Sequence, residues 1–143
     1  MIKKKDVITM RIPFPEVDSE LARYSHMYIC LEHQHPKKFL KCQSAYDYLK
    51  DIKVPPYKFI EVAPDMRHNP FRKPTLIDCD KSFAVDHDIV INEKSLTTKR
   101  RDVSDELFAK LEKKIKHNDF TEIVLEAEKV AQINDKIKLV GGL

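Results

Sequence analysis

The chain has 143 residues, of which 42% are hydrophobic and 34% charged. This composition fits one ordinary globular domain, which at this length buries about two-thirds of its unfolded surface. The 26 basic and 23 acidic side chains leave a formal charge of only +3, so no global electrostatic field marks a nucleic-acid-binding protein, and such a role has to come from local clusters. Since no apolar run has the length of a membrane span, we expect no membrane association.

The first two-thirds of the chain is typical of β structure, because apolar and polar residues alternate between proline-rich or polar loops. The sequence has only two glycines, so its turns must use proline, asparagine and aspartate instead. We predict about six short strands, in residues 6–14, 22–33, 38–49, 57–63, 74–85 and 87–92.

The last third changes to a helical period. Residues 103–118 carry a stripe of apolar residues behind Ser104, a plausible N-cap. Residues 119–134 begin with Asp119 and Glu122 at capping-box spacing and continue with another apolar stripe. We therefore predict two helices whose apolar faces are core or interface. The stripes consist of Leu107, Phe108, Leu111 and Ile115 in the first helix, and Phe120, Ile123, Val124, Ala127 and Val130 or Ala131 in the second.

This order of elements predicts a mainly β fold with C-terminal α structure, namely a short β-barrel followed by one or two helices. Closing a barrel removes the sheet edges and leaves the inter-strand loops to build a site on one rim. We predict one barrel domain over residues 1–118, including the first helix, and a helical extension over residues 119–143.

Three widely spaced cysteines, Cys30, Cys42 and Cys79, form no Cys-x-x-Cys motif, and we expect no signal peptide ahead of them. This pattern favours reduced, buried thiols in a cytoplasmic protein. The histidines around EHQH, residues 32–35, lack the spacing of zinc ligands. We expect neither a metal nor another cofactor.

The stretch PTLIDCDKSFAV, residues 74–85, contains the most unusual local pattern. If it is one strand, Asp78 and Asp80 point to the same face, because side chains alternate. Two such carboxylates repel each other unless a cation, a metal or a substrate lies between them. The pattern indicates either a site or a solvated strand end in which Asp80 pairs with Lys81.

Four basic clusters occur, and each of them alone is explained by a solvated surface: IKKKDV, HPKKFLK, MRHNPFRK and TTKRRD. The third cluster places an exposed-looking aromatic ring among cations. Charge can follow an RNA backbone while a ring stacks on a base, so we predict that this loop contacts substrate, with an ordinary solvated hairpin as the alternative. Its candidate residues are Arg67, His68, Phe71, Arg72 and Lys73.

Over roughly residues 4 to 116 the chain resembles the MazF/PemK family of toxin endoribonucleases from bacterial toxin–antitoxin modules. KKKDVITMRIPFPE resembles the family's opening strand, which begins Gly-Asp-Val/Ile and leads into an acidic loop. ARYSHMYICLE lies where the family has a valine-rich strand after Arg-Pro, and LKCQSAYD matches a strand that ends in Thr-Ser. PTLIDCDKSFAV followed by DVSDELFAKLEKKI is similar to the late strand and C-terminal helix of Gram-positive-like members.

The resemblance implies a small SH3-like plasmid-toxin barrel that cleaves single-stranded RNA without a metal. In such a reaction the ribose 2′-OH attacks the adjacent phosphorus, so the site needs a base, an acid and positive charge on the phosphorane. Residue by residue, it implies catalytic roles for Arg23, Ser44 and Asp80. Substrate contact is expected from the loop above and from Gln43, Asp78 and Lys81. The resemblance also implies a homodimer that a cognate antitoxin neutralises.

The sequence departs from the family at several positions. Lys5 replaces a glycine, Tyr24 a proline, and Gln43-Ser44 the Thr-Ser pair, while Asp78 stands where some members carry an arginine. His26 lies three residues after Arg23, so the two would face opposite sides of a strand.

Two other hypotheses remain open. One is a Mg²⁺-dependent nuclease in which Asp78 and Asp80 bind the metal together with Asp86 or Asp88. The other is a non-catalytic binding module on the same barrel, which poisons a protein such as gyrase or acts through an antitoxin.

Overall fold

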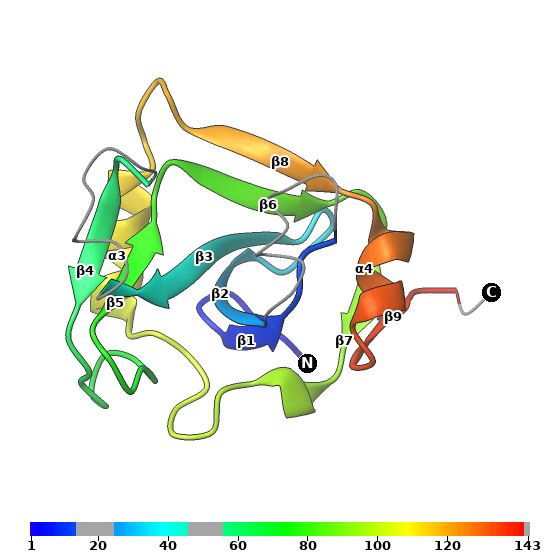
Figure 1. Cartoon of the computed structure of the whole chain (residues 1–143), viewed down its shortest axis with the longest axis horizontal. Coiled ribbons are helices and arrows are strands. Elements are labelled where there is room, and N and C mark those ends of the chain that lie inside the picture. Colours follow the sequence, from blue (N-terminus) through cyan, green and yellow to red (C-terminus); the bar gives the residue numbers. More distant parts are fainter. Residues whose placement is uncertain (14–24, 46–55, 142–143) are drawn as a thin grey trace.

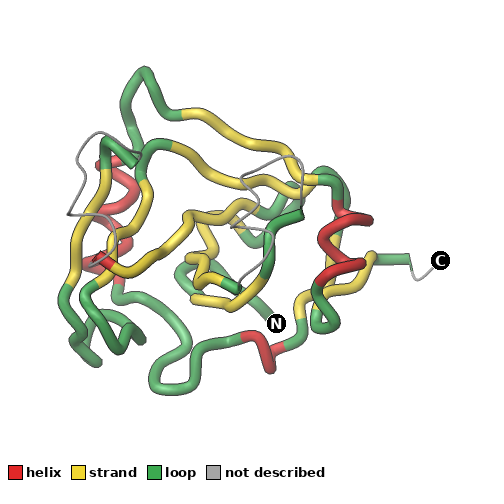
Figure 2. Tube along the Cα trace, in the orientation of Figure 1, coloured by secondary structure: helices red, strands yellow, loops and turns green. Residues whose placement is uncertain are grey.

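The computed structural model describes residues 1–13, 25–45 and 56–141. In this part of the chain the fold is mainly β, with two α-helices, as Figures 1 and 2 show. The predicted fold class is therefore confirmed at this level. No helix in the described ranges combines the length and the apolar character that a membrane crossing requires.

The central sheet is open, so the prediction of a closed barrel is wrong for the described strands. The order of five of its strands is β1-β2-β3-β5-β4. Strand β6 pairs with β3 along one of its own edges and with β8 along the other. Strand β3 pairs with β5 through its last residues and with β6 through its first ones, since the chain turns sharply between β5 and β6. The strands are β1 Val7–Met10, β2 His26–Glu32, β3 Lys38–Ser44, β4 Phe59–Val62, β5 Thr75–Asp78, β6 Lys81–Val85 and β8 Thr121–Leu125.

The remaining elements lie outside this sheet. A two-stranded antiparallel ribbon consists of β7 Ile89–Ile91 and β9 Ile137–Leu139. The 3-10 helix η1 spans Glu93–Ser95, α3 spans Asp105–Lys114 and α4 spans Ala127–Ile133.

The first predicted helix is confirmed as α3. Ser104 caps it as expected, because its hydroxyl accepts a hydrogen bond from the backbone N–H of Leu107. Asp105 and Glu106 occupy the first turn, and Lys113 and Lys114 the last, an arrangement that complements the helix dipole.

The second predicted helix is wrong over its first half. Residues 121–125 form β8, which pairs in parallel with β6, and the helix begins only at Ala127. The predicted capping box at Asp119 therefore does not exist. Instead, the Asp86 carboxylate, just beyond β6, accepts a hydrogen bond from the Ala127 N–H at 2.8 Å.

Both faces of the sheet are buried. The core on one face lies beneath α3 and includes Ile29, Leu40 and Phe108. The core on the other face includes Tyr28 and Phe83, whose rings meet edge to face at 6.1 Å between centroids. This second core is completed by α4, β7, β8 and β9, so residues after 120 supply both a strand and core side chains.

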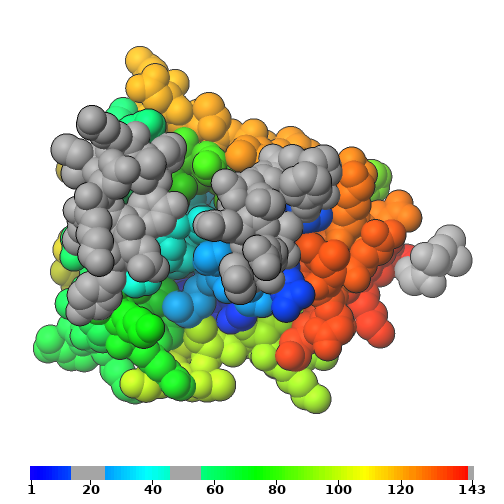
Figure 3. Space-filling model, in the orientation of Figure 1, coloured from blue at the N-terminus to red at the C-terminus, as the bar shows by residue number. Residues whose placement is uncertain are grey.

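Two polar anchors hold the chain ends against this sheet. Asp6, which is 2% exposed, accepts hydrogen bonds from Nε and Nη2 of Arg101 at 3.0 and 2.6 Å. Asn134, after α4, accepts from the Arg11 N–H at 2.8 Å and donates to the Arg11 carbonyl at 2.9 Å. The C-terminal segment therefore lies directly beside the end of β1, as the space-filling view in Figure 3 shows.

Candidate nucleic-acid interface

A groove of about 500 Å³ lies on the α3 side of the sheet, beyond the end of that core. Its floor is a row of side chains on neighbouring strands, since Thr9 pairs with Met27 and Met27 pairs with Cys42. Residues paired directly across antiparallel strands point to the same face. Ser44 and its partner Thr75 continue the floor by one step.

Two loops form the walls of the groove. One contributes Pro70, Arg72 and Lys73, and the other runs from Leu96 to Lys99. Arg100 joins the two loops, because its Nη1 donates to the carbonyls of Met66 and Arg67 at 3.2 and 2.6 Å. The described lining consists of Thr9, Ser25, His26, Met27, Cys42, Gln43, Ser44, Pro70, Arg72, Lys73, Thr75, Leu96, Thr97, Thr98 and Lys99.

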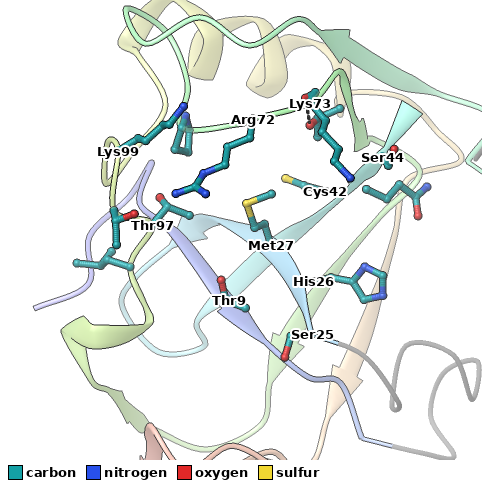
Figure 4. A pocket seen from close by; sticks show the side chains of 15 residues that line it. Thr9, Ser25, His26, Met27, Cys42, Ser44, Arg72, Lys73, Thr97 and Lys99 are labelled. Carbon is teal, nitrogen blue, oxygen red and sulfur yellow. Dashed lines mark hydrogen bonds between the residues drawn. The ribbon is translucent and has the colours of Figure 1, made fainter. Parts of the chain in front are cut away.

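The groove is cationic. Arg72, Lys73 and Lys99 are exposed along its walls, and no described lining residue carries a carboxylate. Figure 4 shows the Arg72 guanidinium extending toward Thr97. Cations and hydroxyls around an apolar floor suit a ligand that has both phosphates and flat apolar surfaces, such as a nucleotide.

His26 and Gln43 line the rim and belong to the opposite face of the sheet. His26 alternates with Met27, and Gln43 with Cys42, and Figure 4 shows the imidazole turned away from Arg72. Burial and the neighbouring charge of Lys41 lower the pKa of His26.

Asp78 lies on that opposite face as well, because it alternates with Ile77 of the α3-side core. Lys41 pairs with Tyr28, and Asp78 pairs with Phe59. Asp78 is 3% exposed. Burial raises its pKa, against the lowering effects of the Asp80 N–H and of nearby Lys81. Asp78 and Lys81 therefore lie close together, and both are outside the groove lining.

The interpretation of residues 74–85 as one continuous strand is wrong. The chain turns between β5 and β6, and the two carboxylates stabilise that turn. The Asp78 carboxylate accepts a hydrogen bond from the Asp80 N–H at 2.7 Å. The Asp80 carboxylate accepts from the N–H groups of Tyr57 and Lys58 at 2.6 and 2.8 Å. Backbone N–H donors thus compensate the negative charges of the Asp78 and Asp80 carboxylates.

This geometry predicts a structural effect for Asp80→Asn. One carboxylate oxygen is replaced by an amide NH₂, which cannot accept the Tyr57 or Lys58 N–H, so the free energy of unfolding should fall by about 2 kcal/mol in urea titrations. Asp119→Asn is the control, because that carboxylate is 88% exposed and 3.6 Å from Lys58, and it should cost less than about 0.5 kcal/mol.

The same pair of variants tests catalysis by Asp80. RNA cleavage per folded molecule that stays within about threefold of the parent assigns Asp80 to the turn, whereas a loss of about a hundredfold makes it catalytic.

The loop 66–73 divides into separate parts. Phe71 is 3% exposed and belongs to the α3-side core, so the prediction of an exposed stacking ring is wrong. The Asn69 side chain holds it there, accepting from the Phe71 N–H at 3.0 Å and donating to Ala63. The buried Phe71 thereby positions the backbone of the next two residues, Arg72 and Lys73, whose side chains line the groove wall.

The two earlier residues of this loop do not line the groove. Arg67 is paired with Asp65 through two hydrogen bonds of 3.3 Å. His68 Nδ1 lies 2.9 Å from the Ser104 hydroxyl at the start of α3. Arg23, the predicted catalytic arginine, lies outside the described residues.

The structure thus brings together Gln43, Ser44, Arg72 and Lys73 from the predicted set. Sequence reasoning missed Thr9, Met27 and Lys99. Lys99 belongs to the noted basic cluster TTKRRD, but nothing in the sequence shows that this segment returns to the end of β1. The isolated bridge between Ile8 and Leu96 is what places it there.

Among the described residues, no group of three or more histidine, cysteine, aspartate or glutamate side chains is arranged to hold a metal ion. Cys30, Cys42 and Cys79 are free, buried thiols, as predicted. Scans against protein-family models, curated proteins and solved structures found no match to the chain.

Proposed function

We propose that the groove binds single-stranded RNA and that the protein is a metal-independent endoribonuclease of the MazF/PemK type. The observation that supports this best is the lining of the groove: Arg72, Lys73 and Lys99 over an apolar floor, with no carboxylate among its described residues. Such a surface attracts a phosphate backbone and repels a bound divalent cation.

In the proposed reaction, the 2′-OH of one nucleotide attacks the following phosphorus and the 5′-oxygen leaves. Arg72 and Lys73 supply positive charge to the phosphorane, where a guanidinium can donate to two oxygens at once. Ser44 can donate a hydrogen bond from the groove floor. The further roles of Arg23 as a phosphate ligand and of Asp80 as a catalytic group rest on the resemblance.

A backbone feature supports the resemblance itself. Lys5 stands where the family has a glycine, and its φ is 78°. This is the left-handed region that glycine occupies without cost and other residues seldom adopt. Lys5 therefore has a backbone conformation that suits a glycine, and its side chain forms an ion pair with Asp105.

A second candidate is an RNA-binding module that does not cleave. It is favoured by the position of Asp80, whose carboxylate is engaged by two backbone N–H groups and is not part of the groove lining. In either case the partners we propose are single-stranded RNA and an antitoxin, with the protein acting as a cytoplasmic homodimer.

The experiment that tests the function is cleavage of a long single-stranded RNA by the purified protein, with and without EDTA. We expect cleavage that EDTA does not affect and that falls by about a hundredfold or more in Arg23→Ala. Arg67→Ala is the control, because its guanidinium is paired with Asp65 and lies outside the groove lining.

Loss of cleavage on chelation would instead indicate a metal-dependent nuclease. Binding without cleavage by the folded protein would leave the non-catalytic module as the function.

A further inference from the structure

A second hollow, of about 630 Å³, adjoins the groove. Thr9, Ser25 and Leu96 line both. Figure 4 shows Thr9 and Ser25 at the end of the groove that lies away from Lys73. The two hollows therefore form one continuous depression that passes over the outer edge of β1.

The second hollow is built largely by the C-terminal segment. Gln132 to Ile137 form one side, and the other side comes from the end of β1 and from η1. The hydrogen bonds between Asn134 and the Arg11 backbone hold the two sides together. Residues beyond the region of family resemblance thus extend a groove that begins within it.

The lining of this hollow is suited to an anionic, hydrogen-bonding ligand. It carries Arg11, Lys94 and Lys136 against one carboxylate, Asp135. None of the three cations forms an ion pair with a described carboxylate. Both lysines are exposed, so they can turn toward a phosphate.

An unpartnered hydroxyl provides independent evidence. Ser95 lines the hollow and is only 5% exposed, and its Oγ has no hydrogen-bond partner within the described part of the chain. A buried hydroxyl without a partner costs free energy, so native structures contain few such groups and each of them calls for an explanation. A polar atom of a bound ligand would satisfy it.

We propose that this second hollow is an additional nucleotide subsite, in which the RNA strand held by the groove continues. Lys94 and Lys136 bind its phosphates, and Ser95 hydrogen-bonds the nucleotide. This inference rests on the proposed function, because it assumes that the groove holds single-stranded RNA. The substrate is accordingly a chain several nucleotides long.

The test measures binding of 2′-O-methyl RNA, which lacks the attacking hydroxyl and is not cleaved. Two random-sequence oligomers are compared. One of about 3 nucleotides can fill the groove alone, and one of about 12 nucleotides can reach both hollows. Lys136→Ala should weaken binding of the long oligomer about fivefold and reduce its salt slope by about 0.7, while leaving the short one unchanged. Ser95→Ala should also weaken the long oligomer about fivefold, without lowering the thermal midpoint.

Lys138→Ala is the matched control. This substitution removes the same charge two residues away, and Lys138 lines neither hollow. Equal affinity of the parent and Lys136→Ala for the long oligomer would overturn the subsite, and so would equal losses in the Lys136 and Lys138 variants. In both cases binding of the short oligomer leaves the proposed function standing. If the parent binds neither oligomer, the proposed function fails and the subsite fails with it.

Discussion

Arg101→Ala is expected to lower the free energy of unfolding by about 3 kcal/mol, because it leaves the Asp6 carboxylate buried without its counter-ion. Asp6 is 2% exposed and receives two hydrogen bonds from the Arg101 guanidinium. The Asp6 carboxylate also accepts a hydrogen bond from the backbone N–H of Lys3 at 2.8 Å. The side-chain hydrogen bonds to Asp6, together with its negative charge, raise the pKa of Arg101.

Urea unfolding followed by circular dichroism measures this effect, and Arg67→Ala is its internal comparison. Arg67 and Asp65 form a similar two-pronged pair, but the Arg67 side chain is 85% exposed. Solvent screening should limit its loss to less than about 0.5 kcal/mol. Equal losses in the two variants would contradict the view that burial makes the Asp6 pair important.

The double substitution Arg72→Ala/Lys73→Ala is expected to weaken single-stranded RNA binding by about fiftyfold. If each side chain contacts one phosphate, the slope of log affinity against log salt should decrease by about 1.4, because a single strand contributes about 0.7 per phosphate. Both side chains are exposed, so the variant should fold like the parent. Titrations of the 2′-O-methyl oligomer at several salt concentrations measure both quantities.

The control for this double variant is Lys110→Ala/Lys113→Ala, which removes the same charge from α3. These lysines line a separate hollow together with Lys58, Lys114 and His117. A comparable loss of affinity in both double variants would show that RNA is attracted by the overall charge and not by the groove.

The sequence predicted most strands of the sheet because their alternation is local information. Met27 and Ile29 face one side and Tyr28 and Cys30 the other, as expected, although both sides are buried. Helix α3 was equally predictable, since its apolar stripe follows a capping serine.

The errors arose where long-range contacts decide the structure. Thr121 to Leu125 fit a strand and a helix almost equally well over so short a length, and only the parallel pairing with β6 selects the strand. Asp78 and Asp80 were assigned to one face because the turn between them carries neither glycine nor proline. The sequence wrongly predicts an exposed ring at Phe71, because the neighbours of this residue in the chain are cations.

For the candidate site, the sequence supplied part of the lining but not its assembly. Ser44, Arg72 and Lys73 were found through the family resemblance and the basic loop. That they share a groove with Lys99 depends on Leu96 meeting Ile8, a contact between segments far apart in the chain. No pattern of composition or spacing reports such a contact.

The two cores also differ in when they can form during translation. The deepest contacts beneath α3 involve residues up to Leu111, whereas the opposite core requires the later residues Val130 and Ile137 to meet Ile2. Because a polypeptide leaves the ribosome from its N-terminus at about 5–20 residues per second, the α3 side can close first. The second hollow needs residues 132–137, so it is completed only after that segment has left the ribosome.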